Sequence, residues 1–192
     1  THKFLHPNSE QKMMSRILSF LFLFAAYSAT VYAESSSPFV PRDFNVPAKF
    51  DTKDFRLRTL TIHDLVKDYD AVMSSAHHIH KIWGPGWPEG LTLEQNLIDL
   101  GWHQKEFQRR RSFAYTVISL DESRILGCIY IDPTRKAGYD AEVYLWARNA
   151  DLEKELIKTT KAWLKREWPF KNPVFPVTDL TKDEWEKVPL IN

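Results

Sequence analysis

Glu142 is the side chain of this sequence best suited to general base chemistry. It lies in the alternating segment 140–148, where Glu142, Tyr144 and Arg148 share one face of an expected strand. A carboxylate on such a face could take a proton from an amine, directly or through water. It could instead pair with Arg148 on the same face. Tyr144, and Tyr130 in the preceding apolar segment, could act as general acids or could be amphipathic sheet residues whose hydroxyls find hydrogen-bond partners.

A second group of side chains with possible function is aromatic: Trp83, Trp87, Trp102 and His103. The first two flank or belong to the sequence Gly-Pro-Gly-Trp-Pro at 84–88, which no helix can cross. The four residues could line a binding pocket, or they could form a small cluster that closes one end of the core. The sequence leaves both interpretations open.

Other kinds of site find little support. His77 and His80 can share a helical face and His78 lies between them, but no Cys motif or well-spaced carboxylate completes a ligand set, so we expect no metal site. The single cysteine, Cys128, is typical of a buried small hydrophobe. The basic run 109–111 is short and predicts a solvated helix end, so we expect no nucleic acid partner. No Gly-x-Ser-x-Gly motif supports a hydrolase.

Composition indicates a globular protein with one domain. The 192 residues are 43% hydrophobic and 14% aromatic, and the formal net charge is +1. This is unlike a disordered chain, and it shows no basic surplus or acidic tail that would imply a polyelectrolyte partner. Once a separable N-terminal segment is set aside, enough chain is left for one hydrophobic core.

Residues 1–33 predict an upstream segment followed by an export signal. Met13, Met14 and Arg16 precede an apolar run at 17–27, and Val31-Tyr32-Ala33 fits a signal peptidase site. The apolar run is short for a membrane span, so no stable span is expected after cleavage. An uncleaved anchor, and an upstream region that is not part of the native protein, stay open as alternatives. A genuine signal implies an exported or periplasmic protein, and a wrong start implies a cytoplasmic one.

The elements that must position these side chains follow from periodicity. Residues 34–50 are rich in Ser and Pro and predict an extended linker, 51–177 predict the domain, and 178–192 predict a polar tail. Apolar residues alternate or run continuously in five segments and recur at helical spacing in three. The expected strands are 55–62, 112–120, 125–131, 140–148 and 172–177, and the expected helices are 64–83, 92–111 and 151–168. The order is β-α-α-β-β-β-α-β, an α/β (α+β) fold.

This order resembles the GNAT superfamily of N-acetyltransferases over residues 39–177. The segments that carry the resemblance are Phe55-Arg56-Leu57-Arg58-Thr59-Leu60, Ile125-Leu126-Gly127-Cys128-Ile129-Tyr130-Ile131 and Asp140-Ala141-Glu142-Val143-Tyr144-Leu145-Trp146. Further segments are similar to a short GNAT-like group: 40–44, 68–75, 100–107 and 139–146. The resemblance implies a mixed central sheet with helices on both faces, and an acceptor pocket near Trp83, Trp87, Trp102 and His103.

The resemblance also implies a place for acetyl-CoA. Backbone amides around Leu145, Trp146 and Ala147 would hold the pantetheine, and the turn at Arg148, Asn149 and Ala150 would hold the pyrophosphate. GNAT enzymes have glycines in that turn, which let backbone N–H groups approach the anion. Here the sequence Arg148-Asn149-Ala150-Asp151-Leu152-Glu153 has none, and it brings two carboxylates. An ordinary helix cap is the alternative interpretation of the turn.

Two functional hypotheses follow. In the first, the chain is an acyl-CoA-dependent N-acyltransferase that acts on a small-molecule amine or a protein, with Glu142 as base and Tyr144 or Tyr130 as acid. In the second, the chain is a non-catalytic GNAT-like domain that binds a ligand or another protein. The acidic turn and the export signal favour the second hypothesis, because acetyl-CoA is a cytoplasmic cofactor. The acceptor and the oligomeric state are not encoded in any motif of the sequence.

Overall fold

The computed structural model describes residues 38–191. The predicted export signal at 1–33 and the first residues of the predicted linker therefore lie outside the described residues and stay predictions. Among residues 38–191, no helix is both long and apolar enough to cross a lipid bilayer.

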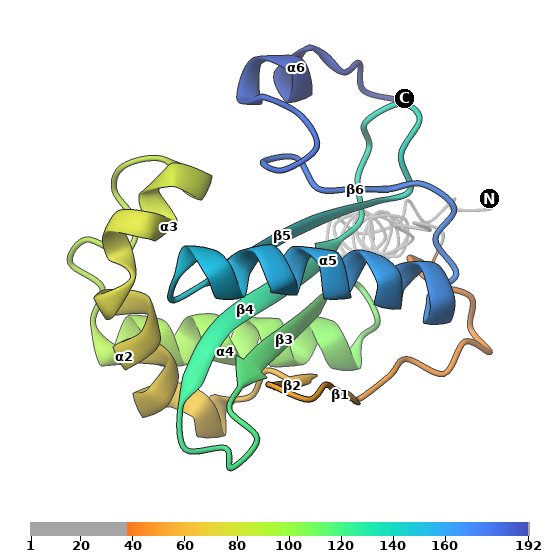
Figure 1. Cartoon of the computed structure of the whole chain (residues 1–192). Coiled ribbons are helices and arrows are strands. Elements are labelled where there is room, and N and C mark those ends of the chain that lie inside the picture. The colour runs from red at the N-terminus through yellow and green to blue at the C-terminus, as the bar shows by residue number, and fades with distance from the viewer. Residues whose placement is uncertain (1–37, 192) are drawn as a thin grey trace, which may run out of the picture. The chain divides into compact units, whose positions relative to one another are not determined.

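One six-stranded sheet organises the domain (Figure 1). Its strands are β1 Lys49–Asp51, β2 Arg56–Thr59, β3 Phe113–Ile118, β4 Ile125–Asp132, β5 Ala141–Ala147 and β6 Pro173–Val174. They lie in the sheet in the order of the chain, and every neighbouring pair is antiparallel except β5 and β6, which are parallel. The mixed sheet expected from the sequence is confirmed.

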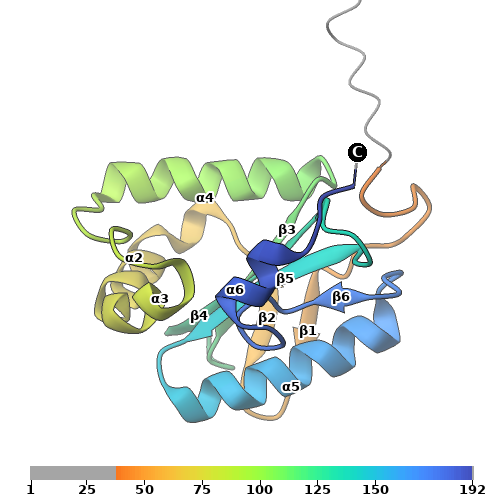
Figure 2. The same ribbon diagram turned by 90° about the horizontal axis from the view of Figure 1, so that it is seen from above.

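Helices cover both faces of this sheet, as Figure 2 shows with α4 on one side and α5 on the other. Between β2 and β3 lie the short helix η1 (Ile62–Asp64) and the helices α2 (Leu65–Ser74), α3 (Ala76–Trp83) and α4 (Leu93–Gln108). Helix α5 (Ala150–Glu167) follows β5, and α6 (Lys182–Lys187) follows β6. The predicted α/β class is therefore confirmed.

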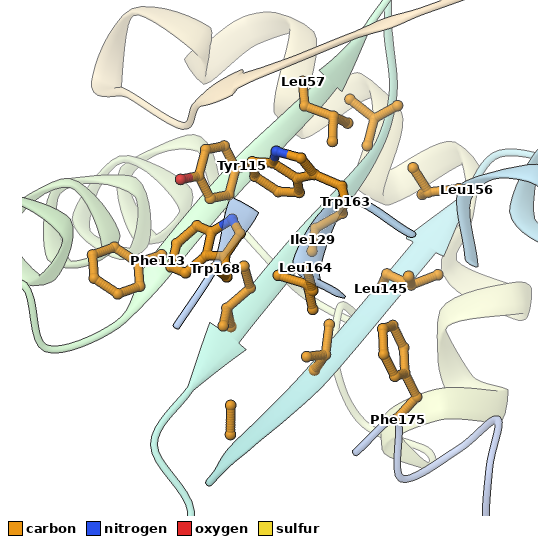
Figure 3. Packing of buried hydrophobic residues seen from close by; sticks show 14 of the residues in the cluster. Leu57, Phe113, Tyr115, Ile129, Leu145, Leu156, Trp163, Leu164, Trp168 and Phe175 are labelled. Carbon is orange, nitrogen blue, oxygen red and sulfur yellow. The ribbon is translucent and has the colours of Figure 1, made fainter. Parts of the chain in front are cut away.

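The larger part of the core lies between the sheet and α5, and it is aromatic (Figure 3). Tyr115 of β3 and Trp163 of α5 are fully buried, and their rings meet edge to face with centroids 5.2 Å apart. Trp168, just after α5, packs against both rings. Aromatic pairs in this geometry add to the stabilisation that burial of their apolar area provides.

Four segments differ from the expectations of the sequence. Residues 38–50, expected as a linker, contain β1 and bury Val40 in the core, because the Pro-rich pattern does not distinguish a solvated linker from an extended segment laid on the domain. The expected helix 64–83 is interrupted at Ser75, whose φ of −108° and ψ of 8° lie outside the helical range. Strand β6 has only two residues. The polar tail forms α6, which begins with a capping box between Thr181 and Glu184.

A buried carboxylate joins α2 to the elements beside it. Asp68 is 4% exposed, accepts a hydrogen bond from Asn96 Nδ2 of α4 at 3.0 Å, and contacts Cys128 Sγ of β4 at 3.7 Å. Burial raises the pKa of Asp68 to about 6, although the hydrogen bond from Asn96 opposes the shift. Asp68 therefore holds its proton to a higher pH in the folded protein than an ordinary aspartate does.

Replacing Asp68 with Asn is expected to stabilise the protein more at neutral pH than in acid. The folded-state pKa of about 6 is above the ordinary value of 3.8, so the stability that Asp68 contributes at low pH is lost as the pH rises through 6. Asn does not titrate. The variant therefore avoids the decrease in the free energy of unfolding, on the order of 3 kcal/mol, that wild type undergoes between acid and neutral pH. Urea unfolding at about pH 4 and about pH 7 measures the free energy of unfolding of the variant and of wild type. If the two proteins differ by the same amount at both pH values, the prediction is contradicted. The control is Asp54→Asn, which replaces an exposed carboxylate.

Candidate functional site: an aromatic pocket and a groove beside strand β5

Strand β5 divides its side chains between two environments. Ala141, Val143, Leu145 and Ala147 belong to the core under α5. Glu142 and Tyr144 alternate with them, so they point to the opposite face, and both are half-buried. Trp146 shares that second face but is fully buried against α2 and α3. Of the three, only Glu142 and Tyr144 are accessible to a ligand by their side chains.

The aromatic pocket is a cavity of about 340 Å³ on this second face. It is lined by Trp83, Trp87, Asp99, His103, Tyr130, Asp132 and Tyr144. The Trp83 ring is central, with centroids 5.6 Å from Trp87, 5.9 Å from Tyr130 and 6.3 Å from Tyr144. A cavity walled by ring faces and edges with two carboxylates suits a ligand that is both apolar and cationic.

Two carboxylates are neighbours on adjacent strands here, Asp132, which lines the pocket, and Glu142, which does not. Asp132 of β4 is the register partner of Glu142 of β5. Burial raises the pKa of Asp132 to about 6, and the negative charge of Glu142 adds to the shift. Burial also raises the pKa of Glu142. Because their pKa values are raised, Asp132 and Glu142 are stronger bases than ordinary carboxylates and accept protons more readily at neutral pH.

A histidine and a second aspartate complete the pocket from α4. His103 Nε2 lies 3.7 Å from Asp99 Oδ2, and its ring is 5.1 Å from that of Tyr130. Burial lowers the pKa of His103, although the charge of Asp99 opposes this. The ring is therefore biased towards its neutral form, and the pocket keeps a net negative charge. Trp102 is 46% exposed and does not line the cavity, but its ring packs on His103 with centroids 4.9 Å apart.

Beside the pocket, β5 separates from β6 and leaves a cavity that we call the splay groove. The two strands pair only at Ala141–Pro173 and Glu142–Val174. Beyond that point lies a cavity of about 230 Å³, lined by Ile82, Val143, Tyr144, Leu145, Glu153, Ile157, Val177 and Thr178. A third cavity, of about 540 Å³, continues between the end of α3 and α6. Tyr144 lines all three cavities, so its ring stands at their junction.

One backbone donor faces the splay groove. Arg148 N–H donates to Leu126 O on the β4 side at 2.8 Å, whereas Ala147 N–H points the other way and donates to Glu153 Oε2 at 3.2 Å. Because peptide groups alternate in direction along a strand, the N–H of Leu145 faces the same side as that of Ala147. Pairing with β6 has already ended there, so this N–H can bind a carbonyl group in the groove.

The start of α5 is occupied by the chain itself. Asn149 caps the helix, because its Oδ1 accepts from Leu152 N–H at 2.9 Å. The guanidinium of Arg148 donates to Ile125 O and Ser74 Oγ, both at 2.6 Å, and pairs with Asp70. Arg148 is therefore bound to α2 and β4 and does not pair with Glu142, so the strand-neighbour pairing considered for Glu142 is wrong.

Comparison with solved structures identifies this architecture. The ribosomal-protein-S5-alanine acetyltransferase from Vibrio fischeri aligns with a TM-score of 0.51 and 16% identity, over 62% of this chain and 67% of that chain. This is the GNAT acetyltransferase fold. The microcin C7 self-immunity acetyltransferase MccE, solved with acetyl-CoA and AMP, has the same TM-score at 13% identity, over 65% of this chain and 68% of its own. No protein-family model and no curated protein matches the sequence.

The GNAT resemblance inferred from the sequence is thus confirmed at the level of the fold. Identities this low show the fold alone, so the site must be argued from its own geometry. Within residues 38–191, no group of three or more His, Cys, Asp or Glu side chains could hold a metal ion.

The two ends of coenzyme A, the pantetheine arm and the nucleotide with its pyrophosphate, do not fit this structure equally well. The splay groove, with its apolar walls and the Leu145 N–H, suits a pantetheine arm. The start of α5 does not suit a pyrophosphate, because the Glu153 carboxylate is already bound to Ala147 N–H and Asp151 adds a second, exposed negative charge. No step of a reaction is therefore derived through the nucleotide end.

The structure brings six of the thirteen predicted site residues together at the aromatic pocket. Trp83, Trp87, His103, Tyr130 and Tyr144 line one cavity, and Glu142 lies beside it. Several other predicted site residues line neither the aromatic pocket nor the splay groove: Trp102, Trp146, Arg148, Asn149 and Ala150. The sequence analysis missed Asp99 and Asp132. Asp132 ends an apolar strand and Asp99 precedes His103 by one helical turn, so both positions carried a usable signal.

Proposed function

We propose that this chain is an N-acyltransferase whose acceptor is an amine bound in the aromatic pocket. The observation that carries the proposal is the pair Asp132 and Glu142, two carboxylates with raised pKa values beside an aromatic cavity that adjoins the splay groove. Acyl transfer to an amine needs a cation site, a proton acceptor and a neighbouring place for the donor. The acetyltransferase neighbours with the same fold support this reaction class.

The acceptor would be held as its ammonium form. Ring faces of Trp83 and Tyr130 attract a cation through their quadrupoles, and the charges of Asp99 and Asp132 add to that attraction. A carboxylate of the Asp132–Glu142 pair then takes the proton and leaves a nucleophilic amine.

The donor would lie in the splay groove with a carbonyl group on the Leu145 N–H. When bound, it supplies the acyl group as a thioester. Burial raises the pKa of Tyr144 to about 12 and raises that of Tyr130 above its ordinary value, so both phenols keep their protons at neutral pH. Tyr144, at the junction of the cavities, is the group we place to donate a proton to the departing thiolate.

Amine binding gives a direct test that does not need turnover. Replacing Trp83 with Leu is expected to raise the dissociation constant of a bound primary amine roughly 10-fold, since a desolvated cation–π contact contributes about 1 to 2 kcal/mol. Trp102→Leu is the matched control, because Trp102 is similarly exposed, at 46% against 40% for Trp83, but lies outside the cavity. Calorimetric titration of the full-length chain with alkyl and aromatic amines measures both constants. Equal effects of the two substitutions would contradict the proposed pocket.

Transfer itself is tested by release of free thiol from acyl-pantetheine and acetyl-CoA in the presence of the tightest-binding amine. A second candidate function, a non-catalytic domain that binds an amine or a protein, is favoured by the carboxylates at the start of α5. Amine binding without thiol release from any donor would support that second function and contradict transfer.

A further inference from the structure

Glu153 reaches back from the first turn of α5 to the end of β5. Its carboxylate accepts from Ala147 N–H at 3.2 Å and pairs with His78 Nε2 of α3. The side chain is 21% exposed, in contrast to 97% for Asp151 in the same turn. Glu153 is therefore a fixed group that joins β5, α3 and α5.

Two backbone donors near this carboxylate are also engaged. The N–H of Leu152 donates to the side chain of Asn149, and the N–H of Glu153 donates to its backbone oxygen. Arg148, directly after β5, is bound to Asp70. An incoming pyrophosphate would meet the partly buried carboxylate of Glu153, and like charges repel strongly where water is partly excluded.

Glu153 also lines the splay groove, but most of the other residues that line it are apolar. Val143, Ile157 and Val177 give it apolar walls, and the Leu145 N–H is its backbone donor. An arm made of methylene and amide groups matches these features without any charge. The chain thus offers complementarity to one part of an acyl-pantetheine thioester and repulsion to the nucleotide diphosphate that coenzyme A adds to it.

We propose that the acyl donor is recognised through its pantetheine arm alone and that Glu153 excludes donors with a pyrophosphate from tight binding. This inference rests on the proposed function, because it names the donor class for the same groove. Carriers that present a pantetheine thioester without a nucleotide are the chemical class that fits.

The test compares two ligands that share the arm. Pantetheine and coenzyme A are titrated into the full-length chain by calorimetry. Dissociation constants within about 3-fold of each other, or weaker binding of coenzyme A, are expected, since the nucleotide gains no contact. Coenzyme A binding at least 10-fold tighter than pantetheine would overturn the inference and leave the proposed function standing. Failure of both ligands to bind would overturn the proposed function and the inference with it.

A variant assigns the effect to Glu153. Glu153→Gln can still accept from Ala147 N–H but carries no charge, and it is expected to tighten coenzyme A binding roughly 10-fold relative to pantetheine. Glu155→Gln removes an exposed charge from the same helix and is expected to change that ratio less than about 2-fold. An unchanged ratio in Glu153→Gln would overturn the role given to this carboxylate. Pantetheine binding by the variant checks that the groove is intact.

Discussion

Replacing Gly127 with Ala is expected to destabilise the domain by about 3 kcal/mol or more, one of the largest effects of any single methyl group in this chain. A Cβ atom at this position in β4 would lie 2.1 Å from Trp146 O and 2.9 Å from Ala147 Cα. Both are backbone atoms of β5, so no side chain can rotate away to relieve the clash. The two strands would have to separate at the end that carries the splay groove.

Gly101 provides the matched control for this prediction. It lies within α4, and an added Cβ would meet nothing closer than Ile62 Cγ2 at 3.9 Å, an ordinary contact. Gly101→Ala is expected to stabilise the protein by about 0.5 to 1 kcal/mol, since Ala loses less backbone entropy than Gly in a helix. Urea unfolding of both variants measures the difference. Tolerance of Ala at 127 within about 1 kcal/mol would contradict the close approach of β4 and β5.

Replacing Asp132 with Asn is expected to lower kcat by roughly 100-fold to 10,000-fold if the chain transfers acyl groups as proposed. The carboxylate must be unprotonated to accept the ammonium proton, so wild-type activity should fall as the pH drops below its pKa of about 6. The variant should lose this acid limb. A full pH profile of kcat/KM for the variant and wild type is the measurement.

The substitution Glu142→Gln distinguishes the role of Glu142 from that of Asp132. Its negative charge contributes to the raised pKa of Asp132, so its removal should move the acid limb to lower pH even where the rate also falls. Asp99→Asn is the control, because Asp99 lines the same pocket beside His103 and should alter KM for the amine more than kcat. An acid limb that is unchanged in both Asp132→Asn and Glu142→Gln would exclude this pair as the proton acceptor.

The sequence was most informative where periodicity was strong. Alternation in β5 correctly divided Val143 and Leu145 from Glu142 and Tyr144, and the order of the main elements led to the correct fold. The Gly-Pro loop correctly suggested that Trp83 and Trp87 lie together. These features depend on local spacing, which a single sequence contains.

The remaining features depend on contacts between distant elements. Asp132 gains its raised pKa from a register partner on the next strand and from burial, neither of which is visible in its own segment. The sequence placed the negative charge of Glu153 in the first turn of α5, but its partners come from α3 and from the end of β5, which the sequence does not show. Val40 is buried in the core although it lies in a Pro-rich segment, and β1 has only three residues, too few to produce an alternating pattern.

The sheet has the same strand order as the chain, and this bears on how the protein is made. Each strand from β2 onward pairs with the strand synthesised just before it. During translation, a strand that leaves the ribosome therefore finds its neighbour already present and waits for no later segment. The growing edge is always the newest strand, and the final edge, β6, has only two residues. While β3, β4 or β5 is the newest strand, the growing edge has six to eight residues. Only the finished sheet has two short edges, β1 and β6, which offer little backbone for pairing with other chains.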